Sequence, residues 1–391
     1  MSLSYGRQYL AIPGPSVIPD SVLQAMHRAS PNIYEGELHD LTASLIPDLK
    51  YVAMTDHNVA IYIGNGHAAW EAALANVVAP GDTVLVLATG RFGIGWGEMA
   101  AGVGAQVEIM DFGAQAAIDL ARVEEVLAAD TAGRIKAVMV VHVDTSTSIK
   151  NDIAGLRAVM DHAGHSALLM ADFIASLGCD RFEMDAWGVD VMVSACQKGL
   201  MTPAGISFVF FNDKAEAAQS ATVSRYWDWR PRIKPEVYYQ YFAGTAPTHH
   251  LYGLRAALDL IKAEGREAVF ARHAKIAQAV WAAIDVWGVD GPMALNVADP
   301  AQRSHAVTSV AMGSSAAKDL RRWTEEKCGL TLGIGLGRDP EEDYFRIGHM
   351  GHLSGHMIMG ALGTIDAGLK ALNIPHGRGA LDAASEVIAT A

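Results

Sequence analysis

The sequence predicts an α/β protein whose mainly parallel sheet is covered by helices on both faces. Two observations carry this prediction: short apolar runs alternate with segments of helical period between about residues 20 and 255, and the runs are almost continuously hydrophobic. Such strands are typical of parallel sheets buried on both sides, which bind ligands at their carboxyl ends. The expected strands are Ala60–Ile63, Thr83–Leu87, Ala137–Val141, Ala167–Met170, Val189–Val193 and Ile206–Phe211.

Three regions are expected along the chain. Residues 1–20 form an N-terminal arm, because the prolines at positions 13, 15 and 19 keep their neighbours out of helical geometry. We expect this arm to pack on a neighbour or a second subunit. Residues 21–260 form the large domain and residues 261–391 a small C-terminal α/β domain. A long helical pattern from Leu251 to Ile284, weakly interrupted by Gly265, is expected to bridge the two domains.

The small domain is expected to contain strands and helices in alternation. They are a strand at Ala306–Met312, a helix at Ala316–Lys327, a strand and turn at Leu330–Gly337, a strand at Tyr344–Gly348 and a helix after Ser354.

Composition restricts the class of protein. With 391 residues, 51% of them hydrophobic, the chain can bury a large core. A net charge of -13 disfavours nucleic acid or an anionic membrane as a partner. The three cysteines match no metal motif or disulfide framework, so we expect no metal and a reducing compartment. No leader or membrane-spanning stretch is recognised, which favours the cytoplasm.

Lys198 and Asp172 carry the strongest chemical signal. Lys198 lies between two apolar strand-like runs, where desolvation favours a neutral amine that can attack a carbonyl and form a Schiff base. Asp172 ends its own apolar run, so its carboxylate is well placed to pair with a pyridinium nitrogen. Together these residues suggest an enzyme that uses pyridoxal phosphate.

A glycine-rich turn follows the first expected strand and opens a helix. The amides of Asn65, Gly66 and His67 would then face outward at the positive end of that helix, where a phosphate binds. Taken alone, this pattern fits an ordinary tight turn better than a binding site.

Two further turns follow expected strands. Phe92 offers a flat surface for a pyridine ring, although an aromatic side chain there also fits a hydrophobic core. Thr145 offers a hydroxyl for the phenolic oxygen of the ring, and helix capping by the same run of serines and threonines is the competing interpretation.

Seven segments in the same order make the chain resemble the class V aminotransferases, which include the alanine- and serine-glyoxylate enzymes. This resemblance implies the fold type I architecture of pyridoxal phosphate enzymes, with a seven-stranded large-domain sheet and a small C-terminal α/β domain. The segments are residues 13–15, 64–67, 144–147, 172–178, 194–200, 245–255 and 346–351.

The resemblance also implies roles for individual residues. Lys198 would form the Schiff base with pyridoxal 5'-phosphate and then shuttle protons, while Asp172 would pair with the ring nitrogen. Phe92 would stack on the ring, and Arg346 would bind the substrate carboxylate. A structural ion pair is the alternative for Arg346.

The cofactor phosphate would be shared between two subunits. Gly66, His67 and Gln197 would contact it from one subunit, and Thr245 and Tyr241 from the other. The family's usual tyrosine position, three residues before the threonine, holds a phenylalanine here, so Tyr241 is the nearest candidate. The resemblance therefore implies a homodimer with shared active sites.

The implied reaction moves an amino group from a small amino acid to glyoxylate by a ping-pong mechanism, with amino acids and 2-oxo acids as its substrates. Arg338 could bind the distal carboxylate of aspartate, or could be an exposed arginine paired with nearby acidic residues. Tyr34 could hydrogen bond to serine. We rank serine and aspartate ahead of alanine as donors.

Two other activities share this fold. A cysteine desulfurase needs a mobile reactive cysteine, whereas Cys328 has the context of a small core residue. Pyridoxamine-pyruvate aminotransferase carries a glutamate that repels phosphate where this chain has Asn65. We also expect His249 and His250 to be interface or surface residues, and residues 227–231 to pack against a partner subunit.

Overall fold

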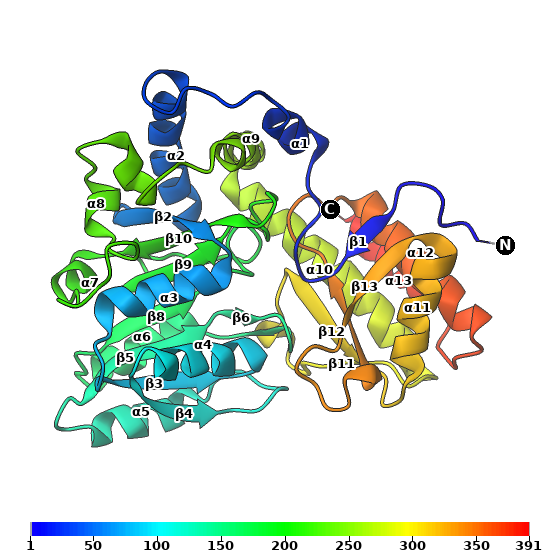
Figure 1. Ribbon diagram of the computed structural model, residues 1–391. Coiled ribbons are helices and arrows are strands. Elements are labelled where there is room, and N and C mark those ends of the chain that lie inside the picture. Colours follow the sequence, from blue (N-terminus) through cyan, green and yellow to red (C-terminus); the bar gives the residue numbers. More distant parts are fainter. Residues whose placement is uncertain (1, 391) are drawn as a thin grey trace.

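The computed structural model describes residues 2–390 and contains two main sheets, each with its own helices (Figure 1). A third, two-stranded sheet pairs β6 (Val143–Asp144) with β7 (Ile149–Lys150). The larger sheet has seven strands in the order β2-β10-β9-β8-β5-β3-β4. Every neighbouring pair is parallel except those of β10, which is antiparallel to both β2 and β9. The strands are β2 (Asn58–Gly64), β3 (Thr83–Ala88), β4 (Gln106–Asp111), β5 (Ile135–Val141), β8 (Leu168–Asp172), β9 (Val191–Ala195) and β10 (Gly205–Phe211).

The apolar runs of the sequence form six of these strands, which confirms the α/β prediction. Strand β4 was missed because it mixes polar and apolar residues. It lies at the edge of the sheet, where only one neighbouring strand pairs with it and most of its side chains are exposed. Hydrophobic continuity therefore marks the buried strands, including β2 at the opposite edge, and not the exposed edge strand β4.

Helices cover both faces of the large sheet. Leu85 and Leu87 of β3 join one hydrophobic core, while Val84 and Val86 join another on the opposite face. Successive side chains of a strand point to opposite faces, so a strand buried on both sides must be apolar throughout. Helices α3 (Gly66–Val77) and α4 (Arg91–Gly102) cover one face, and α2 (Glu37–Ala53), α5 (Leu120–Ala129), α6 (Ile153–His162) and α9 (Thr248–Glu264) cover the other.

The smaller sheet has five strands in the order β1-β13-β14-β12-β11, of which only β1 and β13 pair in parallel. Its strands are β1 (Tyr9–Ala11), β11 (Ala294–Leu295), β12 (Val307–Ala311), β13 (Leu330–Ile334) and β14 (Tyr344–Gly348). It packs against helices α10 (Arg266–Val289), α11 (Ala316–Cys328), α12 (Gly355–Ala371) and α13 (Ala380–Ala389).

The N-terminal arm packs on a neighbouring element of its own chain, which is one of the two expected alternatives. Strand β1 adds to the small sheet beside β13 (Figure 1). After β1 the chain crosses to the large domain and forms the short helix α1 (Asp20–Met26), which packs on α9. The arm thereby joins the two domains.

The bridge between the domains also differs from the prediction. Gly265 has a φ of 87° and separates α9 from α10, so the expected single helix is two helices. Glycine adopts this left-handed conformation without the steric cost that a side chain brings. Val269 of α10 belongs to the core of the large domain and Ile276 to that of the small domain. The limits at residues 20 and 260 remain predictions.

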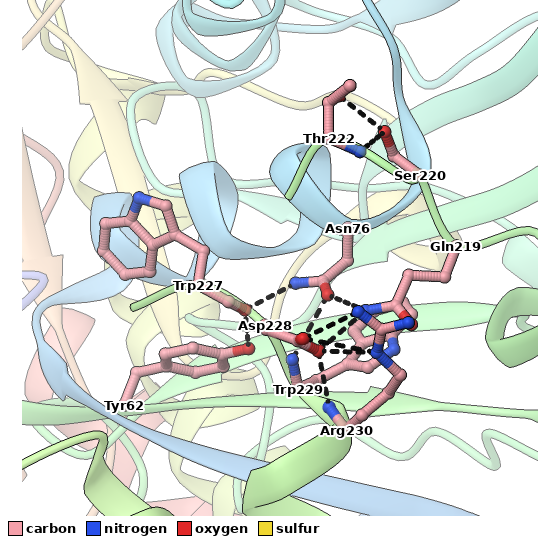
Figure 2. Close-up of polar contacts among 9 residues, drawn as sticks. All are labelled: Tyr62, Asn76, Gln219, Ser220, Thr222, Trp227, Asp228, Trp229 and Arg230. Atoms are coloured by element: carbon pink, nitrogen blue, oxygen red, sulfur yellow. Dashed lines mark hydrogen bonds and ion pairs between the residues drawn. The ribbon is translucent and has the colours of Figure 1, made fainter. Parts of the chain in front are cut away.

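The segment around Trp229 is anchored to its own domain, as Figure 2 shows. Asn76 of α3 donates to the Trp227 carbonyl (2.7 Å) and accepts from the Trp229 amide (3.2 Å). Tyr62 donates to the same Trp227 carbonyl (2.8 Å). Trp229 is fully buried and stacks on Phe211 of β10 with ring centroids 3.8 Å apart. The prediction of a partner-facing loop is therefore wrong for Trp229, which precedes the short helix α8 (Arg230–Ile233).

Within residues 2–390, none of the helices is both long and apolar enough to span a bilayer.

Candidate active site

A cavity of about 250 Å³ lies at the carboxyl ends of the large sheet. Turns that follow β2, β3, β5, β8 and β9 form its walls, and the N-terminal arm closes it with Gly14 and Pro15. The residues predicted for the cofactor meet here because the carboxyl ends of parallel strands share one edge. Those lining the cavity are Asn65, Gly66, His67, Phe92, Thr145, Asp172, Gln197 and Lys198.

Lys198 follows the end of β9 and lies half-buried at the cavity wall. Its ammonium group donates a hydrogen bond to the carbonyl of Pro13 in the arm. Loss of hydration lowers the pKa of Lys198 to about 8, and the positive charge of Arg346 acts in the same direction. The negative charge of Asp172 opposes this shift. An appreciable fraction of the amine is therefore neutral, and hence nucleophilic, near neutral pH.

Asp172 is the last residue of β8, with 3% of its surface exposed. One carboxylate oxygen accepts from the Ile174 amide (2.6 Å), and the other accepts from the Trp70 indole nitrogen (2.7 Å). Burial raises the pKa of Asp172 to about 7, although both hydrogen bonds favour the charged form. A cation placed beside this carboxylate would hold it ionised.

The first turn of α3, where the sequence predicts an anion site, lies at the cavity. The Asn65 side chain accepts a hydrogen bond from the His67 amide (3.1 Å) and so caps the helix. A Cβ atom at Gly66 would lie 2.5 Å from Ile174, so glycine permits the helix to approach the turn after Asp172. The helix presents amide groups and its positive pole to the cavity. Partial burial, and then the charge of Arg91, lower the pKa of His67.

Asp144 fixes the turn that carries Phe92. One oxygen of this buried carboxylate accepts from the amides of Phe92 (2.9 Å) and Gly93 (3.2 Å), which begin α4. The residue preceding α4, Gly90, has no side chain for capping, so Asp144 supplies the cap from another loop. Its other oxygen binds the amide of Ser146 (3.0 Å). Phe92 is thereby held at the cavity wall.

Arg346 lies in β14 of the small sheet and is 6% exposed. It does not itself line the cavity, but it bonds to Thr145, which does. It donates to the carbonyls of Ile334 (2.6 Å) and Thr145 (2.8 Å), and it forms no ion pair with any carboxylate within residues 2–390. The structural ion pair considered from the sequence is therefore not what the structure shows. Burial lowers the pKa of Arg346 to about 10. A buried guanidinium without a carboxylate partner suits an anionic ligand.

Gln197 and Thr145 both contribute polar groups to the cavity. The Gln197 side-chain oxygen is buried without a hydrogen-bond partner within residues 2–390. Thr145 accepts a hydrogen bond from Arg346 through its carbonyl, while its side chain lines the cavity.

Arg338 does not line the cavity. Its two terminal nitrogens donate to the Ala114 carbonyl (3.0 Å) and the Asn296 side chain (3.0 Å). Its guanidinium also lies 4.2 Å from the centre of the Tyr344 ring. It is neither beside a substrate nor paired with the acidic residues that follow it, so both interpretations of the sequence differ from the structure.

Three other predicted residues lie away from this chain's own cavity. Tyr34 is 85% exposed. Thr245 is exposed, and Tyr241 packs against Tyr238 and Phe242 beside the core of the large domain. Within a single chain, none of the three lines the cavity.

Sequence reasoning missed Trp70, Asp144 and Pro13. Trp70 lies three residues after His67, so a helical reading of the glycine-rich segment could have placed both on one face. Asp144 lies within the run that supplied Thr145, but only the hydroxyl groups of that run were considered. Pro13 contributes a backbone carbonyl, which leaves no signal in the sequence.

Within residues 2–390, no group of three or more histidine, cysteine, aspartate or glutamate side chains could hold a metal ion. His249 and His250 instead contact the carbonyls of Arg28 (3.0 Å) and Ala204 (3.2 Å).

Comparisons with known proteins agree with this geometry. Residues 8–337 match the class-V aminotransferases. A serine-glyoxylate aminotransferase of Hyphomicrobium methylovorum is 35% identical, over 93% of this chain and 89% of that protein. An L-aspartate-glyoxylate aminotransferase of Paracoccus denitrificans is 34% identical, over 93% and 91% of the two chains.

A solved structure is also similar over nearly the whole chain. Pyridoxamine-pyruvate aminotransferase from Mesorhizobium loti has a TM-score of 0.89 and 25% identity, and the match covers 99% of this chain and 98% of that one. Both the sequence match and the arrangement of the site lead to one conclusion. The chain belongs to the class-V aminotransferase family.

Proposed function

We propose that this protein uses pyridoxal 5'-phosphate to move the amino group of a small amino acid to glyoxylate, giving glycine and a 2-oxo acid. The observation that carries the proposal is the meeting of Lys198, Asp172 and the amino end of α3 in one cavity. An amine, a buried carboxylate and an anion site match the three polar parts of this cofactor.

The residues present fit the cofactor. The amino end of α3, with Gly66 and His67, would hold the phosphate, and Asn65 would face it with a neutral amide. Gln197 would contribute its side chain, whose buried oxygen has no partner within residues 2–390. Asp172 would pair with the ring nitrogen. Two further residues complete the site: Phe92 would lie against the ring face, and Thr145 would reach the phenolic oxygen.

The cofactor, when bound, supplies a carbonyl for covalent attachment and a ring that withdraws electrons from the substrate. Lys198 is the attachment point and then the base, because its pKa of about 8 allows it both to accept and to return a proton near neutral pH. Asp172, buried at the end of β8, would supply the negative charge that favours a protonated ring nitrogen.

Arg346 orients the substrate. Two of its nitrogens are held by backbone carbonyls, which fixes the direction of the guanidinium. A carboxylate bound to the remaining edge would hold the α-hydrogen toward Lys198. Donor and acceptor both carry an α-carboxylate and would use the same site in turn, which gives ping-pong kinetics.

We propose serine as the preferred donor. Arg338 was the candidate partner for a distal carboxylate, but its terminal nitrogens are engaged by Ala114 and Asn296. Lys198 and His67 are the cationic side chains that line the described cavity, and Arg346, which adjoins it through Thr145, is assigned to the α-carboxylate, so no further cation remains for a distal carboxylate. A small neutral side chain therefore fits better than that of aspartate. Tyr34 is exposed and has no support as a donor ligand within one chain. Glyoxylate as acceptor rests on the relatives named for that reaction.

A homodimer with shared active sites belongs to the same proposal. Thr245 is exposed and lies outside its own chain's cavity, which supports a contact with the phosphate of a second subunit. Tyr241 is the accompanying candidate. We also propose a cytoplasmic location, which is supported by the absence of a disulfide among the three cysteines.

A cysteine desulfurase is the less favoured alternative. Cys328 lines a second cavity between the arm and α12 and does not line the one that contains Lys198. Pyridoxamine-pyruvate aminotransferase is likewise less favoured, because Asn65 places a neutral amide at the anion site.

The test is to add pyridoxal 5'-phosphate to the purified protein and follow the visible absorbance. Borohydride reduction followed by peptide mass spectrometry should locate the cofactor on Lys198. Initial rates with serine, aspartate and alanine should then be compared, each with glyoxylate as acceptor. Sulfide release from cysteine and transamination of pyridoxamine with pyruvate test the alternatives. A protein that stays colourless and is not trapped at Lys198 would overturn the proposal.

A further inference from the structure

Trp70 connects the amino end of α3, the proposed phosphate site, with Asp172, the carboxylate proposed to pair with the cofactor ring. It lies on α3, one turn after the amino end of the helix, and is 1% exposed. Its indole nitrogen donates to Asp172 at 2.7 Å, and its side chain lines the cavity. The helix end proposed to bind the phosphate and the indole that donates to Asp172 therefore belong to the same helix, α3.

Aromatic neighbours leave the indole little freedom to turn. The ring of Trp96 stacks on it with centroids 5.9 Å apart and planes at 15°, and Phe92 meets it edge to face at 6.3 Å. His67 lies at 4.6 Å. A donor held in this way presents its N–H in one direction, so the hydrogen bond also fixes the orientation of the carboxylate.

We propose that Trp70 is a positioning residue for transamination: its indole N–H favours the charged form of Asp172 and aims the free side of that carboxylate at the ring nitrogen. The proposal rests on the proposed function and adds a residue that acts through Asp172. A buried carboxylate without this donor would keep only the Ile174 amide as a hydrogen-bond partner. Its charged form would then be less stable.

Other groups also influence Asp172. The Ile174 amide favours the charged form, and the positive charge of Lys198 does so more weakly. The negative charge of Asp144 disfavours it. Each of these groups stays in place when Trp70 alone is changed, so the contribution of the indole can be isolated.

Trp96 provides a matched control. It is also 1% exposed and lies in the same aromatic cluster, but its indole nitrogen has no hydrogen-bond partner within residues 2–390. Trp70→Phe and Trp96→Phe make the same chemical change in the same core. Only the first removes a hydrogen bond to Asp172.

The first readout needs neither cofactor nor activity. In apoprotein labelled with ¹⁵N-isoleucine, the Ile174 amide reports the ionisation of Asp172, to which it is bonded. Trp70→Phe should raise the midpoint of the Asp172 titration by about one pH unit or more, which is a tenfold change in the protonation constant of that carboxylate. Hydrogen bonds to charged groups are among the stronger hydrogen bonds in proteins, so the loss of one should be measurable. Trp96→Phe should leave the midpoint unchanged. Equal midpoints in the two variants would overturn the proposal.

A measurement on the unmodified protein covers the case in which Trp70→Phe does not fold. One of the eight tryptophan indole resonances should shift with the same midpoint as the Ile174 amide. That shift should disappear in Asp172→Asn. If no indole resonance follows the ionisation of Asp172, the hydrogen bond is absent and the proposal is wrong.

The second readout uses protein loaded with pyridoxal 5'-phosphate. Trp70→Phe should lower kcat/KM at least about tenfold and move its acid limb to higher pH, while Trp96→Phe stays within about threefold of the unmodified protein. An equal loss of kcat/KM in both variants, without a change in its pH profile, would show that Trp70 contributes only to packing. Failure of the unmodified protein to bind the cofactor would instead contradict the proposed function, and the apoprotein titration would still test the hydrogen bond.

Discussion

The two sheets contribute to the site in different ways. The seven-stranded sheet is mainly parallel, and turns after five of its strands reach one cavity. The five-stranded sheet is mainly antiparallel and supplies Arg346 from the middle of a strand, together with the arm that follows β1. Parallel strands all place the residues at their carboxyl ends at a shared edge, whereas neighbouring strands of an antiparallel sheet end at opposite edges.

This difference explains which site predictions agree with the structure. Residues after strands of the large sheet line the cavity, as the positions of Asp172 and Lys198 illustrate. In the small domain, nearness in sequence was misleading: Arg338 lies eight residues before Arg346 but is turned toward Ala114 and Asn296. Position relative to a parallel strand is a better guide to a site than distance along the chain.

Lys198→Ala is the strongest test of whether the reaction takes place at the carboxyl ends of the large sheet. We expect kcat for serine with glyoxylate to fall by about 10⁴-fold or more, because both the attachment point and the base are removed. Lys214→Ala is the matched control, since Lys214 also lies in the large domain but binds Asp190 at 3.1 Å. A Lys198→Ala protein with nearly full activity would show that the chemistry lies elsewhere.

Asp172→Asn tests the protonation of the buried carboxylate at the same edge of the sheet, through its effect on the free energy of unfolding. The folded-state pKa of Asp172 is raised from 3.8 to about 7, so folding favours the protonated acid. In the apoprotein this stabilisation is fully present below pH 3.8 and is lost as pH rises through 7. We expect the free energy of unfolding of the unmodified apoprotein to decrease across this window by on the order of 3 kcal/mol more than that of Asp172→Asn.

Chemical denaturation at several pH values measures this difference. Parallel profiles for the two proteins would mean that Asp172 is not held protonated by burial. The cofactor should reduce the difference, because a cation beside Asp172 favours its charged form.

Arg346→Lys tests the contribution of the small sheet. We expect kcat/KM to fall about 10- to 100-fold, because an ammonium group cannot form two parallel hydrogen bonds to a carboxylate. Steady-state kinetics with serine and with glyoxylate should show the loss for both substrates. Arg303→Lys is the control: Arg303 also donates to two backbone carbonyls, at 2.9 and 2.8 Å, but neither belongs to a residue that lines the cavity, whereas Arg346 binds the carbonyl of Thr145, which does. Equal losses in the two variants would indicate a structural effect.

Arg338→Gln should have the smallest effect. We expect kcat/KM for serine and for aspartate each to change by less than about threefold, because the guanidinium is bonded within the fold and lies outside the cavity. A selective loss of aspartate activity would restore Arg338 as a specificity residue. It would also contradict our preference for serine as donor.

Much of the fold could be predicted because buried positions are occupied by apolar residues, which can be recognised in the sequence. The central strand β5 is apolar from Ala137 to Val141, since both of its faces are covered there. The edge strand β4 and the short strand β1 could not be predicted in this way. Their pairing is determined by a neighbouring strand and not by their own hydrophobicity.

The sequence by itself determined the chemical inventory and its order: an amine, a carboxylate and a glycine-rich turn, each after an apolar strand. Only the tertiary structure decided which groups meet. Trp70 and Asp172 lie 102 residues apart, and Arg346 and Thr145 lie 201 apart, yet each pair shares a hydrogen bond. Contacts over such separations depend on how strands and helices pack, and local residue patterns do not encode the orientation of a distant side chain.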